Sequence, residues 1–233
     1  MLERANNRPH NQIRECKIEK NYLNTAAGSV LISMGHTKVL CTATLDKKVP
    51  KFIKNTGTGW LTAEYSMLPC ATSTRNDREA TKGKQKGRTI EIQRLIGRSL
   101  RQMINFKELG EITIKVDCDV IQADGGTRTA AITGASIAVV DAINAKLPEQ
   151  ASNIIQTQIA AISVGICDEI PLLDLDYQED SNAQTDMNII LNDNLDLIEI
   201  QGTAEQKPFN RKELNTLLDL AEKGIEQLLP LIK

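Results

Sequence analysis

Aromatic side chains are scarce in this chain, whose 233 residues include one Trp, three Tyr and three Phe. Stacking of bases on aromatic rings is therefore excluded as its main means of holding single-stranded nucleic acid. Histidine is scarcer still. His10 lies in a polar N-terminal stretch and His36 at the tip of an expected hairpin. We predict that both lie at the surface, so a pair of imidazoles acting as acid and base at one site is not expected.

The five cysteines are odd in number, widely spaced and form no Cys-x-x-Cys pair, which argues against a disulfide framework or a metal-thiolate site. Cys41, Cys118 and Cys167 lie in apolar strand-like runs, where reduced cysteines behave as small core residues. We therefore predict a reducing, cytoplasmic location. No apolar run approaches the roughly 20 residues that span a bilayer, and the N-terminus lacks the apolar core of a secretory signal. Neither export nor a membrane partner is expected.

Charge is nearly balanced overall, with 28 basic and 30 acidic residues, but it is unevenly distributed. Between Arg75 and Arg101, nine Lys or Arg residues stand against three acids, whereas the rest of the chain is acidic. A concentrated positive segment in a nearly neutral protein indicates a site for a polyanion. The sequence contains neither a G-x-S-x-G nucleophile turn nor a Walker phosphate loop.

Hydrophobic periodicity predicts an α+β fold of two loosely repeated halves packed together, in each of which strands are followed by a helix. Predicted strands span residues 29–34, 38–46, 60–68, 112–120, 159–167, 170–177, 187–191 and 195–202. One predicted helix begins at Thr89, and two further helices are predicted to span residues 130–145 and 210–229. Residues 75–86 contain almost no apolar side chain and are expected to form a mobile basic loop. A break at 147–150 divides one domain of residues 1–233 into halves of approximately 1–147 and 151–233.

The hexapeptide Asp124-Gly125-Gly126-Thr127-Arg128-Thr129 falls between a predicted strand and a predicted helix. Its glycines can adopt backbone angles closed to other residues, and the first N–H groups of the following helix lack intrahelical acceptors. Such a turn binds anions, and Arg128 adds a charged fork that matches two phosphate oxygens. The alternative at this point is an ordinary glycine turn in which Thr caps the helix.

The last third of the chain is acidic, and its densest stretch contains Asp174, Asp176, Glu179 and Asp180, with Asp186 six residues later. Asp174 and Asp176 would face the same side of the predicted strand, and a hairpin could bring Asp180 and Asp186 together. Carboxylates at this density face water, pair with Arg or hold a divalent cation such as Mg²⁺. A solvated acidic face is the simpler interpretation of this segment when it is taken alone.

Six runs distributed over nearly the whole chain share one resemblance. They are GWLTAEYSMLP at 59–69, GRTIEIQRLIGR at 87–98, DCDVIQADGGTRT at 117–129, the acidic segment at 174–188, QGT at 201–203 and LAEKGI at 220–225. Together they resemble the ribonuclease PH family, phosphate-dependent 3′ exoribonucleases that trim transfer RNA precursors. The resemblance implies an α+β fold, a two-layer mixed sandwich of two pseudo-repeated, strand-rich halves. It also implies RNA as the substrate, nucleoside diphosphates as products and a homo-hexameric ring built as a trimer of dimers.

The resemblance also assigns roles to residues of this chain. It implies that inorganic phosphate, the co-substrate, is bound by Arg88, Gly126, Thr127 and Arg128, and that the catalytic carboxylates are Asp180 and Asp186. Our hypothesis is that Asp186 binds Mg²⁺ and Asp180 assists proton delivery to the departing 3′ oxygen, or that these roles are exchanged, so both are expected at the metal. Candidates for guiding the RNA backbone are Arg75, Arg78, Arg94 and Arg98, although Arg94 could instead pair with carboxylates at a subunit contact.

Two positions depart from the pattern of the family. Cys70 stands where an Arg is usual, so the RNA or subunit contact that this Arg would make is not expected here, and Asn6-Asn7-Arg8 stands where Asp-Gly-Arg is common. Two other functions also remain open at this stage. A non-catalytic RNA-binding subunit of an exosome-like ring would keep the scaffold without the chemistry, and a metal-dependent hydrolytic nuclease would use the acidic pair without a phosphate cradle.

Overall fold

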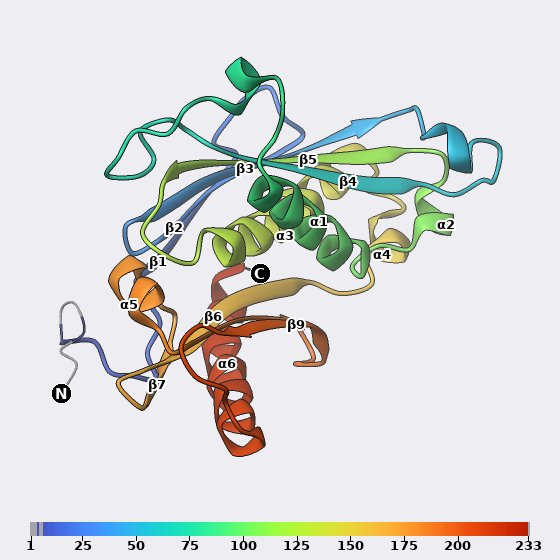
Figure 1. Cartoon of the computed structure of the whole chain (residues 1–233). Helices are drawn as coiled ribbons and strands as arrows, with labels where there is room; N and C mark the ends of the chain where they lie inside the picture. Colours follow the sequence, from blue (N-terminus) through green and yellow to red (C-terminus); the bar gives the residue numbers. More distant parts are fainter. Residues whose placement is uncertain (1–3, 5–6, 233) are drawn as a thin grey trace.

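Two β-sheets and the helices packed against them make up the structure, a computed structural model that describes residue 4 and residues 7–232 (Figure 1). The predicted α+β class is confirmed. The first sheet has the strand order β1-β2-β3-β5-β4. Its strands are β1 (Cys16–Lys20), β2 (Gly28–Met34), β3 (Thr37–Asp46), β4 (Trp60–Met67) and β5 (Thr113–Gln122).

Only one pair of neighbouring strands in this sheet, β4 and β5, is parallel. A parallel pair requires a long crossover, and here the crossover carries a short 3₁₀ turn (η3, Glu79–Lys82), helix α1 (Gly87–Arg101) and a single turn, α2 (Phe106–Leu109). Helix α1 is amphipathic and packs its apolar side, including Ile92, Leu95 and Ile96, into the core beneath β4. This packing determines where Arg88, in the first turn of α1, is held.

The second sheet is antiparallel, with the strand order β7-β6-β8-β9. Its strands are β6 (Ile159–Cys167), β7 (Ile170–Leu173), β8 (Thr185–Asn192) and β9 (Leu197–Ala204). The closing helix α6 (Arg211–Ile232) packs on β6 and β7, and Asn210 caps it by accepting hydrogen bonds from two backbone N–H groups. The remaining short elements are η2 (Lys51–Ile53), α4 (Ala151–Ile154) and α5 (Tyr177–Asn182).

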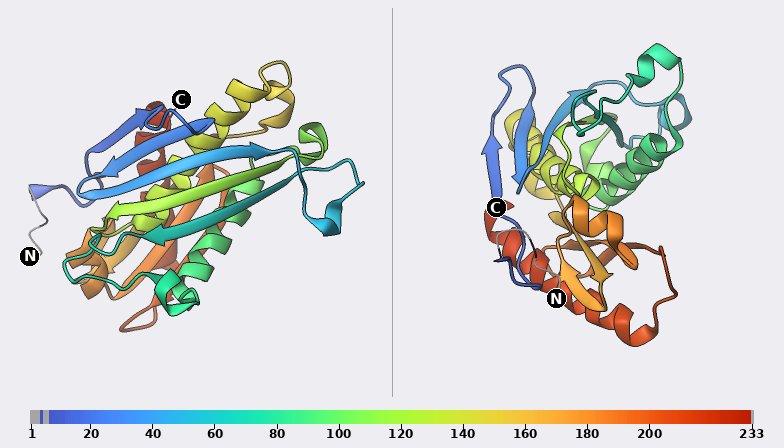
Figure 2. Two further views of the ribbon diagram at one scale, coloured as in Figure 1. Left: turned by 90° about the horizontal axis from the view of Figure 1, so that it is seen from above. Right: turned by 60° about the vertical axis from the view of Figure 1, so that its left-hand side comes forward.

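Helix α3 (Thr127–Lys146) lies between the two sheets and is buried on nearly all sides, as the sheet above it in Figure 1 and the view from above in Figure 2 show. Strand β2 approaches it so closely that a Cβ on Gly28 would lie 1.9 Å from the Ala138 carbonyl oxygen. On the other side, the Ala161 N–H of β6 donates to the Thr133 hydroxyl at 3.0 Å. The helix is thus wedged against both halves, and its N-terminus has a fixed position.

Most elements fall within a few residues of their predicted bounds, but the strand predicted at 170–177 is wrong beyond Leu173. Asp174 adopts a left-handed backbone conformation with φ of 54°, which ends β7, and the chain then turns into α5. Asp174 and Asp176 therefore do not share a strand face. The buried Cys41, Cys118 and Cys167 and the exposed His10 and His36 lie as expected, and no helix in the described residues is long and apolar enough to cross a membrane.

A buried ion pair between Arg14 and Asp174 joins the two halves of the chain. The guanidinium donates to both carboxylate oxygens of Asp174, from Nη2 at 2.7 Å and from Nε at 3.0 Å, and the Arg14 backbone N–H donates at 2.7 Å. The third nitrogen, Nη1, donates to the carbonyl oxygen of Asp124. One side chain near the N-terminus thus fixes the glycine turn of the first half and the segment before α5 in the second.

Two further arginines extend this network toward α5. Arg4 donates to both carboxylate oxygens of Glu179, at 2.6 and 2.9 Å, and Arg8 donates to the same group at 3.2 Å. Glu179 also accepts from the Asp176 backbone N–H, which completes a capping box at the start of α5. Asn7, at the position where the family that the sequence resembles usually has Gly, adopts a left-handed φ of 53° that Asn tolerates. Asn6, the first residue of that departure, lies outside the described residues.

Asp174→Asn should destabilise the protein by about 3–5 kcal/mol, because it leaves a buried guanidinium without its counter-ion. Asn tolerates the same left-handed backbone conformation, so the effect comes from the lost charge and from the replacement of one accepting oxygen by an N–H₂ donor, and not from the backbone. Urea unfolding measures the effect. The matched control is Glu169→Gln, since Glu169 also has a left-handed φ and an ion pair, with Lys207, but is exposed. Equal stability changes in the two variants would contradict this account.

Candidate active site

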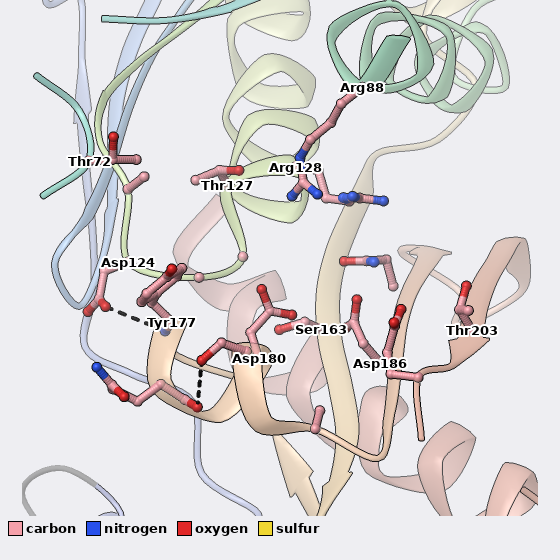
Figure 3. Close-up of a pocket in the computed structure, with 18 of the residues that line it drawn as sticks. Thr72, Arg88, Asp124, Thr127, Arg128, Ser163, Tyr177, Asp180, Asp186 and Thr203 are labelled. Carbon is pink, nitrogen blue, oxygen red and sulfur yellow. Dashed lines mark hydrogen bonds between the residues drawn. The ribbon is translucent and has the colours of Figure 1, made fainter. Parts of the chain in front are cut away.

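A pocket of about 1230 Å³ opens where the two halves meet (Figure 3). The first half supplies the glycine turn, the first turns of α1 and α3, and residues 72–74 and 76 of the loop after β4. The second half supplies α5, β8, β9 and the start of the following loop. All six residues predicted to bind phosphate or carry the catalytic carboxylates line this pocket, namely Arg88, Gly126, Thr127, Arg128, Asp180 and Asp186.

The glycine turn is shaped by close packing as well as by backbone angles. Gly125 and Gly126 have φ of 71° and 62°, and Gly126 is the N-cap residue of α3. A Cβ on Gly125 would lie 2.5 Å from the Leu175 carbonyl oxygen, so only glycine lets the turn pack against the segment before α5. The Thr37 hydroxyl donates to the Gly125 carbonyl oxygen at 2.6 Å and accepts from the Asp124 N–H at 2.9 Å. The first N–H groups of α3 therefore face the pocket from a fixed position.

Two side chains that sequence reasoning missed orient the polar groups of this turn. The Tyr65 hydroxyl of β4 donates to the Thr127 hydroxyl at 2.9 Å, which leaves the Thr127 proton available for a ligand. Burial raises the pKa of Tyr65, so it remains a donor. On the other side, Arg128 Nη1 donates to the Gln201 amide oxygen of β9 at 2.7 Å. Figure 3 shows the exposed Arg88 side chain reaching from α1 toward Arg128.

Asp180, in α5, and Asp186, in β8, face the same pocket from its acidic side (Figure 3). Burial and then the charge of Asp180 raise the pKa of Asp186 to about 6, while Arg128 and Arg88 act in the opposite direction. Burial likewise raises the pKa of Asp180 despite the charges of Arg88 and Arg128. Glu205, which sequence reasoning also missed, lines the pocket and raises the pKa of both carboxyls. The pocket thus contains two arginines and two carboxyl groups that ionise less readily than an ordinary Asp side chain.

Asp180 and Asp186 offer carboxylate oxygens, which are ligands that Mg²⁺ prefers. Among the described residues, no group of three or more His, Cys, Asp or Glu side chains is arranged to hold a metal. Mg²⁺ commonly takes one or two carboxylates and completes its coordination with water and substrate phosphate, so Asp180 and Asp186 suffice. A cation between them would also relieve the repulsion that raises the pKa of Asp186.

The four arginines predicted to guide RNA lie outside the pocket lining, and their role remains a prediction. Arg75 stands between Thr74 and Asn76, which do line the pocket, and forms an exposed ion pair with Asp77. Arg98 pairs with Glu199 of β9, an interaction within the chain. Arg78, at the start of η3, and Arg94, on α1, are exposed.

Comparison with known proteins gives a consistent result over the whole chain. Residues 12–143 match the family model described as 3′ exoribonuclease family, domain 1, and residues 157–224 match domain 2 of the same family. The structure of the Archaeoglobus fulgidus exosome with RNA bound to the active site contains a chain with a TM-score of 0.84 and 20% identity, and the match covers 99% of this chain and 93% of that one.

Two further solved structures are similar in fold. Rice (Oryza sativa) Rrp46 has a TM-score of 0.80 and 17% identity, with 98% of both chains covered. An archaeal exosome core chain has a TM-score of 0.77 and 18% identity, with 97% of this chain and 89% of that chain covered. At these identities the likeness to solved structures shows a shared fold.

Asp186→Asn should raise stability at pH 8 in metal-free buffer, by about 1–3 kcal/mol. The pKa of Asp186 in the folded protein, about 6, lies above the value of about 3.9 for unfolded Asp. Its ionisation therefore costs stability as the pH rises from about 4 through 6, and the variant escapes this cost. Urea unfolding with EDTA at pH 8 and pH 4 measures the difference, which should vanish at pH 4. A variant less stable than the parent at pH 8 would contradict the assignment.

Proposed function

The chain belongs to the 3′ exoribonuclease family of ribonuclease PH, and on that premise we propose that it is a phosphate-dependent 3′–5′ exoribonuclease. Its proposed substrates are the 3′ ends of tRNA precursors and other RNA, and its products are nucleoside diphosphates. The observation that carries the proposal is the convergence, in one pocket, of a glycine turn with two arginines and a pair of half-buried carboxyl groups whose pKa values are raised. A hydrolytic nuclease would need the carboxylates but no cradle for a free phosphate.

The main barrier to phosphorolysis is repulsion between the attacking phosphate and the phosphodiester it must approach. Arg88 and Arg128 compensate this charge, while the Thr127 hydroxyl and the first N–H groups of α3 orient the phosphate. A phosphate oxygen then forms a bond to the phosphorus of the last phosphodiester, and the bond from that phosphorus to the 3′ oxygen of the preceding nucleotide breaks. The terminal nucleotide leaves as a nucleoside diphosphate.

The departing 3′ oxygen must gain a proton, and one carboxyl of the Asp180 and Asp186 pair is the proposed donor. Burial raises the pKa of both Asp180 and Asp186, which is the direction that a proton donor near neutral pH requires. In this proposal one of the two carboxyls keeps its proton for the leaving oxygen, and the other, ionised, would hold Mg²⁺, whose charge would offset negative charge at the scissile phosphate. Retention of both carboxylates and both arginines favours an active enzyme over a non-catalytic RNA-binding ring subunit.

The proposed RNA path follows the basic segment at the pocket rim. Arg75 and Arg78 in the loop, and Arg94 and Arg98 on α1, are the proposed contacts to the RNA backbone. The similarity of the fold to exosome chains supports a ring, for which we propose a homo-hexamer, a trimer of dimers, working in the cytoplasm. Native mass measurement of the purified protein tests the assembly.

Release of nucleotide from RNA with a free 3′ hydroxyl should depend on added inorganic phosphate, and the product should be a nucleoside diphosphate. Phosphate is the nucleophile, so its omission removes a reactant. Chromatography of the released nucleotides with and without phosphate, in the presence of Mg²⁺, gives the result. RNA blocked by a 3′ phosphate is the control. Monophosphate release without added phosphate would instead identify a hydrolase, and tight RNA binding without any product would identify a non-catalytic subunit.

Arg88→Ala should raise the KM for phosphate by about tenfold or more and change RNA affinity little, because it removes a charged donor to the nucleophile. Arg94→Ala, on the same helix but outside the pocket, should show the reverse pattern. Phosphate titrations of the initial rate and RNA binding by fluorescence anisotropy separate the two effects. If Arg88→Ala weakened RNA and phosphate binding equally, the proposed division between the cradle and the RNA path would be wrong.

A further inference from the structure

A chain of hydrogen bonds from α1 through β9 to α3 sets the direction of Arg128. The Gln201 side-chain amide nitrogen donates to Glu91 Oε1 at 2.7 Å, and the Gln201 amide oxygen accepts from Arg128 Nη1 at 2.7 Å. Arg128 Nη1 lies 3.6 Å from the same Glu91 oxygen. All three side chains line the pocket, and each comes from a different element.

The orientation of the Gln201 amide follows from its two neighbours. A guanidinium can only donate, so it must meet the amide oxygen, and an ionised carboxylate can only accept, so it must meet the amide nitrogen. With this orientation Gln201 satisfies both charged groups at once. Either reversed contact would place two donors or two acceptors against each other.

Gln201 also affects which of two negative groups, Glu91 or a bound phosphate, the Arg128 guanidinium contacts. Glu91 and a phosphate in the cradle both attract the guanidinium, and a direct bidentate pair with Glu91 would turn its donors away from the glycine turn. By occupying Glu91 Oε1 and one donor of Arg128, the neutral amide keeps the acid and the guanidinium from closing onto each other. The other donors of Arg128 remain available to a ligand.

We propose that Gln201 is a positioning residue that holds the Arg128 guanidinium toward the phosphate nucleophile and limits its pairing with Glu91 to a single contact at 3.6 Å. The identity of the ligand as phosphate rests on the proposed function. The role of Gln201 rests on the contacts alone, and it is expressed in the affinity for phosphate. A merely structural contribution from β9 would change folding stability instead.

The test measures binding of inorganic phosphate by calorimetry in the parent protein, in Gln201→Leu and in Glu199→Gln. Glu199 is the matched control, because its pair with Arg98 also joins β9 to α1 but lies outside the pocket lining. Gln201→Leu should weaken phosphate binding about tenfold, the effect of losing one hydrogen bond to a charged group, and leave RNA affinity unchanged. Glu199→Gln should leave phosphate affinity unchanged.

A second comparison shows whether Gln201 acts through Arg128. In an Arg128→Ala background, assayed at high phosphate concentration, Gln201→Leu should weaken binding no further. An equal loss in both backgrounds, or no loss in either, would overturn the proposal, as would a parent protein that does not bind phosphate. If the parent binds phosphate but releases no nucleoside diphosphate from RNA, the proposed function fails while the binding comparison still decides the role of Gln201.

Discussion

The ion pair between Arg14 and Asp174 is the constraint on which the site depends, because it connects parts of the chain that form separate sheets. Through one guanidinium, the carbonyl oxygen of Asp124 in the glycine turn and the carboxylate of Asp174 before α5 are held at a fixed separation. Gly125 can then pack directly on the backbone at Leu175. A buried pair of this kind contributes little net stability, but an arrangement of the two halves that separated it would leave a buried charge without its partner.

That arrangement concentrates opposite charges from different halves in one pocket. The first half contributes Arg88 and Arg128, and the second contributes Asp180 and Asp186. The arginines are not close enough to the carboxyls to form ion pairs with them, and they lower the pKa of Asp186 too little to offset burial. Folding therefore leaves both charge sets incompletely neutralised, which is unfavourable for stability and suited to a ligand that carries phosphate.

Sequence patterns predict the parts of this site that depend on local structure. The glycine turn between a strand and a helix and the amphipathic start of α1 both follow from short-range periodicity, and both lie where expected. The end of β7 could not be predicted, because Asp174 adopts its left-handed conformation to meet Arg14, 160 residues away along the chain. Tyr65 and Gln201 both lie in runs that carry the family resemblance, but their roles depend on contacts with residues far along the chain and could not be assigned from those runs.

The division of the pocket between the two halves also separates the residues proposed for binding from those proposed for chemistry. The proposed phosphate cradle is built almost wholly from the first half, with Gln201 as the contribution of the second, whereas the carboxyl pair belongs to α5 and β8. Replacing the carboxyls would remove a buried repulsion and leave the arginines and the glycine turn in place. Replacement of the two carboxyl groups should therefore favour stability and leave the residues proposed for binding unchanged. Both carboxyl groups are present in this chain although their ionisation lowers the stability of the fold. This cost is the strongest physical argument that they have a function.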